Sequence, residues 1–152
     1  MWTGKDIPAD THRVDDLRGW DLAMGLRGLL AGTWQADFDG MLELFALAPG
    51  DVSECGAFLA LTGAFDAAVE AGDGTSVAAV MREVDGVMAA CEGRLDESDR
   101  ERLHTAAVTC FLEGVLPVRA DRFAMVAPHI GTATRRWFEQ WDPWRLEPGP
   151  TI

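Results

Sequence analysis

The chain lacks a hydrophobic run long enough to cross a membrane. Its longest uncharged apolar stretches, such as residues 55–65, reach about a dozen residues, whereas a membrane-spanning helix needs about 20. The first residues, from Met1 to Asp6, also lack the basic segment and apolar core of a secretory signal. We therefore expect no contact with membranes and a cytoplasmic location.

Cysteine and histidine are scarce, with 3 of each in the chain. An odd number of cysteines in a chain without an export signal argues against a disulfide framework. Cys55, Cys91 and Cys110 each fall in an apolar helical pattern, so we expect all three to be reduced and buried. The histidines are too scattered to provide the closely spaced ligands of a zinc site, and we predict no metal and no cofactor.

Basic charge is also scarce, because 13 Lys and Arg stand against 25 Asp and Glu, a formal net charge of −12. Residues 51–101 carry twelve acids and three bases, a net charge of −9, whereas residues 118–145 carry five arginines and three acids, a net charge of +2. Such a surface repels nucleic acids and anionic membranes, so neither is an expected partner. It favours encounter with a basic protein, although the charge could also serve only to keep the protein in solution.

No segment shows the alternation of apolar and polar residues that is typical of a β-strand. Apolar residues instead recur every three or four positions, most clearly at Val77, Val80, Met81, Val84, Val87, Met88 and Cys91. This spacing places one apolar stripe along a helix. We predict an all-α fold in which residues 1–152 form a single compact bundle of about five to seven helices.

Capping residues and helix breakers divide the chain further. They predict helices over about residues 14–30, 33–46, 51–71, 75–93, 96–115, 119–126 and 128–140, an irregular lead-in over 1–13 and an irregular tail over 146–152. Asp51 is the predicted cap of the third helix, and Thr75 or Ser76 that of the fourth. Because the turn at 72–74 is tight, helices three and four should form an antiparallel hairpin. The helix over 96–115 is apolar on both sides, which is typical of a central helix.

The first candidate set for partner binding is acidic. It comprises Glu83, Asp85, Asp96, Glu97, Asp99 and Glu101. The four acids at 96–101 begin a helix, whose dipole stabilises negative charge, so a purely structural role is the alternative. They lack the turning glycine and the closing glutamate of a calcium loop.

The second candidate set is aromatic. Trp137, Trp141 and Trp144 lie close together in the sequence, near Arg135 and Arg136. Tryptophan and arginine are enriched at the energetic centres of protein interfaces. The alternative is that the last helix packs these rings onto the core.

Two further residues are candidates for the polar groups of an apolar pocket between helices. His104 lies one turn beyond Arg100, and Glu113 lies at the border of an apolar helix side, where we expect a buried carboxylate. Without a nucleophile or a metal nearby, a satisfied histidine and a structural carboxylate are the alternatives. We predict no catalytic residue.

The segment over residues 109–116 resembles a group of small bacterial all-α proteins of unassigned activity. The resemblance covers roughly residues 55–116 and rests on Phe111, Leu112 and Glu113, which follow two amphipathic helices. Some members of that group look like immunity proteins encoded beside polymorphic toxin genes. The resemblance therefore implies an all-α protein that binds a toxin.

These observations lead to a first hypothesis and two alternatives. The first is a non-enzymatic acidic protein-binding domain, most concretely an immunity or antitoxin protein that neutralises a basic toxin. The second is a helical-bundle enzyme or small-molecule binder with a pocket between its helices. The third is a homo-oligomer joined through its apolar tail.

Overall fold

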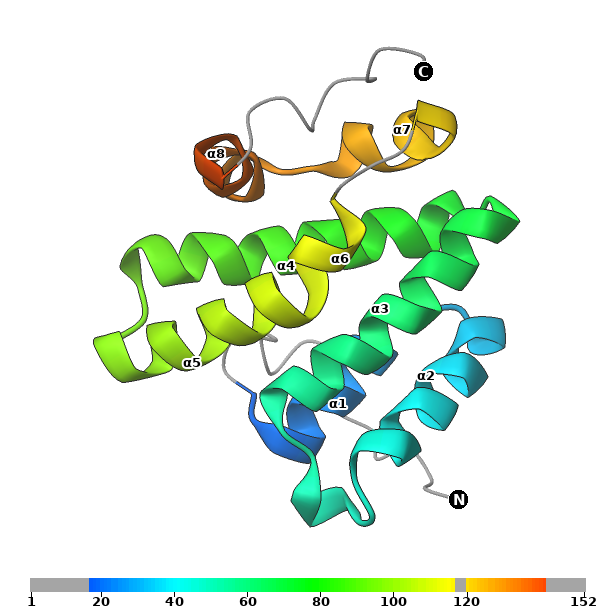
Figure 1. The fold of residues 1–152 in the computed structure, drawn as a ribbon, viewed down its shortest axis with the longest axis vertical. Coiled ribbons are helices and arrows are strands. Elements are labelled where there is room, and N and C mark those ends of the chain that lie inside the picture. Colours follow the sequence, from blue (N-terminus) through cyan, green and yellow to red (C-terminus); the bar gives the residue numbers. More distant parts are fainter. Residues whose placement is uncertain (1–16, 117–119, 142–152) are drawn as a thin grey trace.

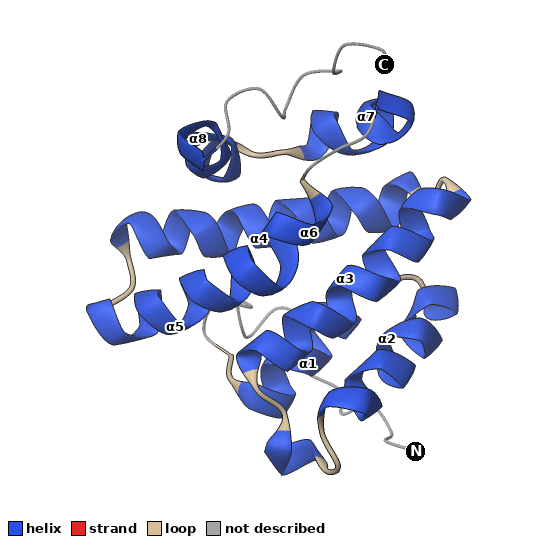
Figure 2. Cartoon of the chain, viewed as in Figure 1, coloured by secondary structure: helices blue, strands red, loops and turns tan. Residues whose placement is uncertain are grey.

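The computed structural model describes residues 17–116 and 120–141, which form helices joined by short connections (Figure 1). These two ranges contain no β-strand, and the all-α prediction is confirmed (Figure 2). No helix within them is both long and apolar enough to cross a membrane. The predicted irregular ends, 1–13 and 146–152, lie outside the described residues.

The helices follow one another in a simple order. They are α1 (Gly19–Arg27), α2 (Gly32–Phe45), η2 (Pro49–Asp51), α3 (Glu54–Ala71), α4 (Gly74–Gly93), α5 (Glu97–Ala107), η3 (Val108–Leu112), α6 (Glu113–Val115), α7 (Ala120–Val126), η4 (Ala127–His129) and α8 (Thr132–Trp141). η2 and η4 are short 3₁₀ turns, and η3 is a π-helical turn. Because α5, η3 and α6 are continuous, the described residues contain seven longer helical rods, as many as the predicted bundle allows.

The helix starts are set by side chains that accept backbone N–H groups. Ser53, not Asp51, caps α3, with its hydroxyl 3.0 Å from the amide nitrogen of Gly56. Asp73 caps α4 through the amide of Ser76 at 3.2 Å, so the cap predicted at 75 or 76 lies two or three residues too late. Both errors have one cause: several neighbouring residues were suitable caps, and the backbone path decides which side chain reaches the free N–H groups of the first turn.

The predicted hairpin of α3 and α4 is present. Gly72 ends α3 in the left-handed conformation with φ 76°, and its amide and that of Asp73 bond back to carbonyls of the last turn. Only these two residues separate the helices, so the chain reverses direction sharply. In Figure 1 the two helices diverge from this turn, which leaves room for the α5–η3–α6 rod between them.

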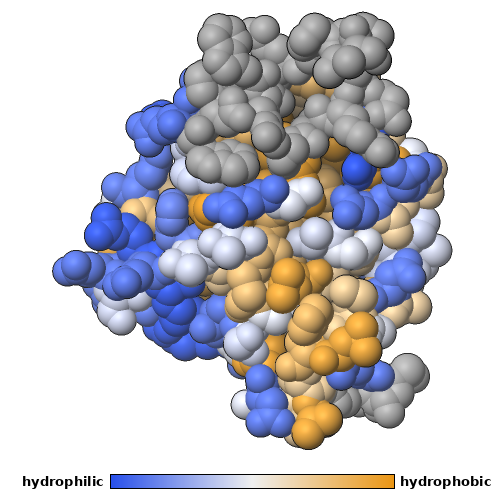
Figure 3. All heavy atoms as spheres, in the orientation of Figure 1, coloured by the Kyte–Doolittle hydropathy of each residue, from blue (hydrophilic) through white to orange (hydrophobic). Residues whose placement is uncertain are grey.

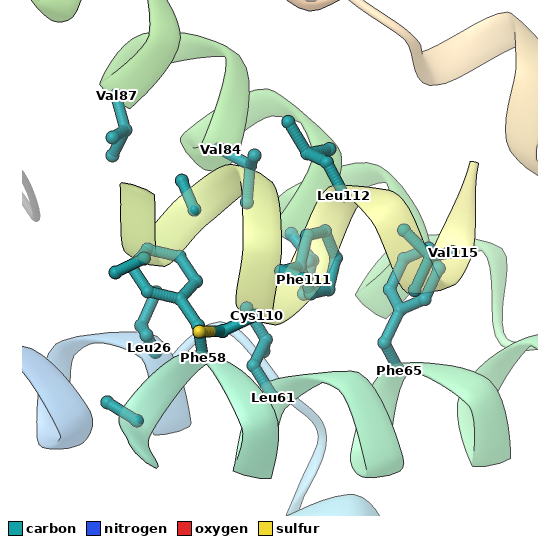
Figure 4. Close-up of a cluster of buried hydrophobic side chains, with 14 of the residues drawn as sticks. Leu26, Phe58, Leu61, Phe65, Val84, Val87, Cys110, Phe111, Leu112 and Val115 are labelled. Atoms are coloured by element: carbon teal, nitrogen blue, oxygen red, sulfur yellow. The ribbon is translucent and has the colours of Figure 1, made fainter. Parts of the chain in front are cut away.

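The core lies where α3, α4 and the α5–η3–α6 rod meet (Figure 4). The ring of Phe111 contacts that of Phe65 edge-on at 5.3 Å and that of Phe58 at 6.5 Å. Val108 and Leu112 are buried, and so are Cys110 and Phe111, which the sequence places on the opposite side of the helix. The prediction of a central helix is confirmed.

The π-helical turn is held by α3. The hydroxyl of Thr62 lies 2.9 Å from the carbonyl oxygen of Cys110 and 3.0 Å from that of Phe58. A π turn leaves backbone carbonyls without their usual helical partners, and Thr62 satisfies one of them from the neighbouring helix.

The prediction of three reduced cysteines is wrong for two of them. Cys55 at the start of α3 and Cys110 in η3 form a disulfide, with their Cα atoms 5.5 Å apart. The two apolar helix faces that each cysteine helps to form pack against each other, which brings the sulfurs within bonding reach. Cys91 is free and buried as expected, and burial raises the pKa of its thiol.

Candidate functional site

A cleft of about 600 Å³ lies between the C-terminal part of α4, the helix α5 and the helix α8. In Figure 1 α8 lies across one end of α4, and α5 runs along the other side of α4. The cleft is lined by Met88, Cys91 and Glu92 of α4, by Glu97, Arg100, Glu101, His104 and Thr105 of α5, and by Arg136, Trp137 and Gln140 of α8. The cleft therefore brings together members of the acidic set, the aromatic set and the pocket pair: Glu97, Glu101, Trp137 and His104.

α5 supplies the acidic side of the cleft. Asp96, one of the two residues expected to open this helix, caps it by accepting the amide of Asp99 at 2.8 Å; the other, Ser98, does not. Glu97 and Glu101 then lie one turn apart on the same helix face and are both exposed. His104 continues this face by three residues, so two carboxylates and an imidazole border the cleft.

α8 is held in place by a carboxylate from another helix. Asp85 of α4 accepts the amide of Thr134 in the first turn of α8 at 2.8 Å. The carboxylate lies so close to Gly131 that a methyl group there would overlap it. Asp85 is thus a helix cap supplied across the interface between α4 and α8.

An ion pair also joins α8 to α4 at the cleft. The guanidinium of Arg136 donates two hydrogen bonds to Glu92, from Nη2 at 2.6 Å and from Nε at 2.9 Å. These bonds lower the pKa of Glu92 and raise that of Arg136. With this pair neutralised, the remaining charges of the lining are Glu97, Glu101 and Arg100, an excess of one negative charge.

His104 is half-buried, and its pKa is lowered first by burial and then by the positive charge of Arg100. The imidazole is therefore neutral at pH 7, with one nitrogen able to accept a hydrogen bond and the other able to donate one. It adds a polar group to the cleft without adding charge.

Trp137 was expected either at a binding surface or packed onto the core, and its position combines the two. It is half-buried, and its ring stacks at 5.8 Å and 19° on the ring of Phe138, which is fully buried. It packs against the core and also lines the cleft. Trp141 is the last residue of α8, and its side chain and Trp144 lie outside the described residues.

The other predicted acids serve the fold. Asp99 accepts hydrogen bonds from Nη2 of Arg18 at 2.6 Å and from Nη2 of Arg102 at 3.3 Å, and Arg18 is the main cause of its lowered pKa. Glu83 is half-buried on α4 and takes part in interactions with other residues. Of the acidic set, Glu97 and Glu101 line the cleft.

The expectation for Glu113 is wrong. This carboxylate is exposed and does not line the cleft. The preceding π turn has more residues per turn than an α-helix, so a helical wheel drawn through residues 108–112 places every later residue on the wrong side. The sequence analysis also missed the roles of Glu92 and Arg136, which no local spacing could reveal because they pair across 44 residues.

Among the described residues, no three His, Cys, Asp or Glu side chains come together in a way that could hold a metal ion. Comparison of the chain with protein-family models, with curated proteins and with solved structures finds no match.

Proposed function

We propose that the chain is a non-enzymatic protein-binding domain whose cleft receives a basic side chain of its partner. One observation carries this proposal: Glu97, Glu101 and Trp137, from the acidic and the aromatic candidate sets, line the same cleft. Carboxylates and a tryptophan ring are the groups that recognise a guanidinium or an ammonium group, by ion pairing and by cation–π contact. An arginine fits best, because its planar head can stack on a ring while its edge faces a carboxylate.

The rest of the molecule supports a basic partner. The formal net charge of −12 speeds the approach of a positively charged protein and disfavours acidic competitors. In its most concrete form, the proposal is that this chain is an immunity or antitoxin protein that covers the active site of a basic toxin. The resemblance of residues 55–116 to small bacterial all-α proteins, some of them immunity-like, supports this form.

The proposal is tested with basic proteins encoded beside the gene for this chain. The purified chain is mixed with each of them, complex formation is followed by titration calorimetry, and rescue of growth is scored in cells that express the candidate toxin. We expect one partner to bind and to lose its toxicity. If none binds and none is neutralised, the immunity function is wrong.

Charge-neutral variants then test the cleft. Glu97→Gln and Glu101→Gln should each weaken the complex, and the double variant by about ten-fold or more, since paired charges at interfaces contribute on that scale. Glu113→Gln is the matched control, because it removes the same charge from an exposed position outside the cleft. If Glu113→Gln weakened the complex as much as Glu97→Gln or Glu101→Gln does, only the overall charge would matter and the role of the cleft would be wrong.

A second candidate function uses the same cleft for a small molecule. Its volume of about 600 Å³ is typical of ligand pockets, which measure roughly 300–1,000 Å³. A thermal-shift screen against metabolites and metal ions tests this candidate, because a bound ligand raises the melting temperature by mass action. A compound that stabilises the wild type but not the His104→Gln variant would establish it.

A further inference from the structure

The C-terminal end of α2 carries an exposed apolar cluster that we call the apolar tip. It consists of Leu44, Phe45 and Leu47, whose exposed fractions are 75%, 45% and 95%. Figure 3 shows hydrophobic surface gathered at the lower end of the view, over the connection between α2 and α3. Single exposed leucines are common in proteins, but three large apolar side chains within four positions make a contiguous patch. The tip belongs to different elements from those that form the cleft.

The stretch of chain that contains the tip carries only acidic charge of its own. Residues 28–81 contain eight acids and no Lys, Arg or His. Asp37, Glu43 and Asp51 are exposed on α2 and η2, before and after the tip along the chain. The ion pairs of this region are made by arginines from other helices, such as Arg122 of α7 with Asp66 and Arg102 of α5 with Glu54.

A stripe of small residues runs along the exposed part of α2 toward the tip. Gly32, Ala36 and Gly40 follow one another at intervals of four and are all exposed. A methyl group at Gly32 or Gly40 would meet nothing within 4 Å, so the fold itself does not require glycine there. A mid-helix glycine costs about 0.5–1 kcal/mol relative to alanine. Because these side chains are short, the backbone of a partner helix can approach α2 closely along this stripe.

We infer that the apolar tip and the adjoining side of α2 bind a basic amphipathic helix of a partner protein. The apolar side of that helix would cover Leu44, Phe45 and Leu47, and its Lys and Arg residues would face the surrounding acids. The negative charge favours a basic helix over the other possible partners. A second copy of the chain would bring like acids close together, and an anionic membrane would be repelled. The inference shares with the proposed function only the premise that the chain binds a protein.

The test uses a fluorescent synthetic peptide of about 18 residues, long enough for a stable surface helix, built from Leu and Lys with amphipathic spacing. Fluorescence anisotropy measures its affinity for the full chain. We expect the wild type to bind it, and the Leu44→Ser/Leu47→Ser variant to bind at least about ten-fold more weakly, as for central apolar contacts. The variant should keep the wild-type melting temperature, because both side chains are already exposed. A Leu/Glu peptide should not bind.

The controls separate this inference from the proposed function. The Glu97→Gln/Glu101→Gln variant should bind the peptide like the wild type, because the cleft is on other helices. Equal binding by the tip variant and the wild type would overturn the inference, since net charge alone would then explain the affinity. A dimer in light scattering that the tip substitutions abolish would also overturn it, by assigning the tip to a second copy. If the chain binds the peptide but binds none of the candidate toxins, only the immunity function is wrong.

Discussion

At the scale of single residues, the contact between Asp85 and Gly131 decides how α8 is docked. We expect Gly131→Ala to lower the free energy of unfolding by about 1–3 kcal/mol, because the new methyl group overlaps the Asp85 carboxylate. Asp85→Ala should cost about 1 kcal/mol through loss of the cap on Thr134. Chemical denaturation of the two single variants and the double variant measures both effects. If the two substitutions act additively, the residues are not in contact.

His104 is the residue whose titration should affect stability near neutral pH. Its pKa is lower in the folded chain than in the unfolded chain. Below about pH 6.5 the imidazole is therefore protonated more fully in the unfolded state than in the folded state. Stability therefore falls as the pH drops from about 7 toward the folded pKa, and the His104→Gln variant should lose this dependence. Glu92 and Asp99, whose pKa values are also lowered, act only below about pH 4.5. An unchanged slope in the variant would contradict this assignment.

At the scale of helices, the disulfide between α3 and η3 is the main covalent constraint. It closes a loop of 55 residues, and its reduction should lower the free energy of unfolding by about 2–4 kcal/mol. Alkylation followed by mass spectrometry measures the thiols: we expect none to react in the folded chain, one after unfolding, and three after unfolding with reductant. Reaction of all three without reductant would mean that no disulfide forms.

Disulfides persist mainly in oxidising compartments, so the cytoplasmic location stays a prediction that the same experiment on protein from cells can test.

The helices themselves could be predicted from the sequence, because their signals are local. The apolar spacing in α4 and the glycine at 72 predict a helix and a turn whatever surrounds them. The register beyond η3 could not be predicted, because a π turn depends on a partner such as Thr62 from another helix. For the same reason, the sequence could propose Glu97, Glu101 and Trp137 as binding residues but could not show that α5 and α8 bring them into one cleft.

At the scale of the whole molecule, the negative charge and the two proposed surfaces favour the same kind of partner, a basic protein. Acids outnumber bases 25 to 13, most of the described arginines pair with acids, and we propose two surfaces for a partner: the cleft and the apolar tip. A partner that uses both would need basic groups at each, since binding energy from two weak sites combines when one molecule spans them. This account treats the negative charge as a determinant of partner choice.

The most direct test of the central claim is an NMR titration of the Trp137 indole N–H with a short arginine peptide. The Trp137→Phe variant assigns the signal, and Glu113→Gln is again the charge-matched control. The account predicts a shift of this signal that saturates with peptide in the wild type and the control, and that is largely lost in Glu97→Gln/Glu101→Gln. An indole signal that does not respond to the peptide, or that responds equally in the cleft variant, would contradict the claim that this cleft recognises basic side chains.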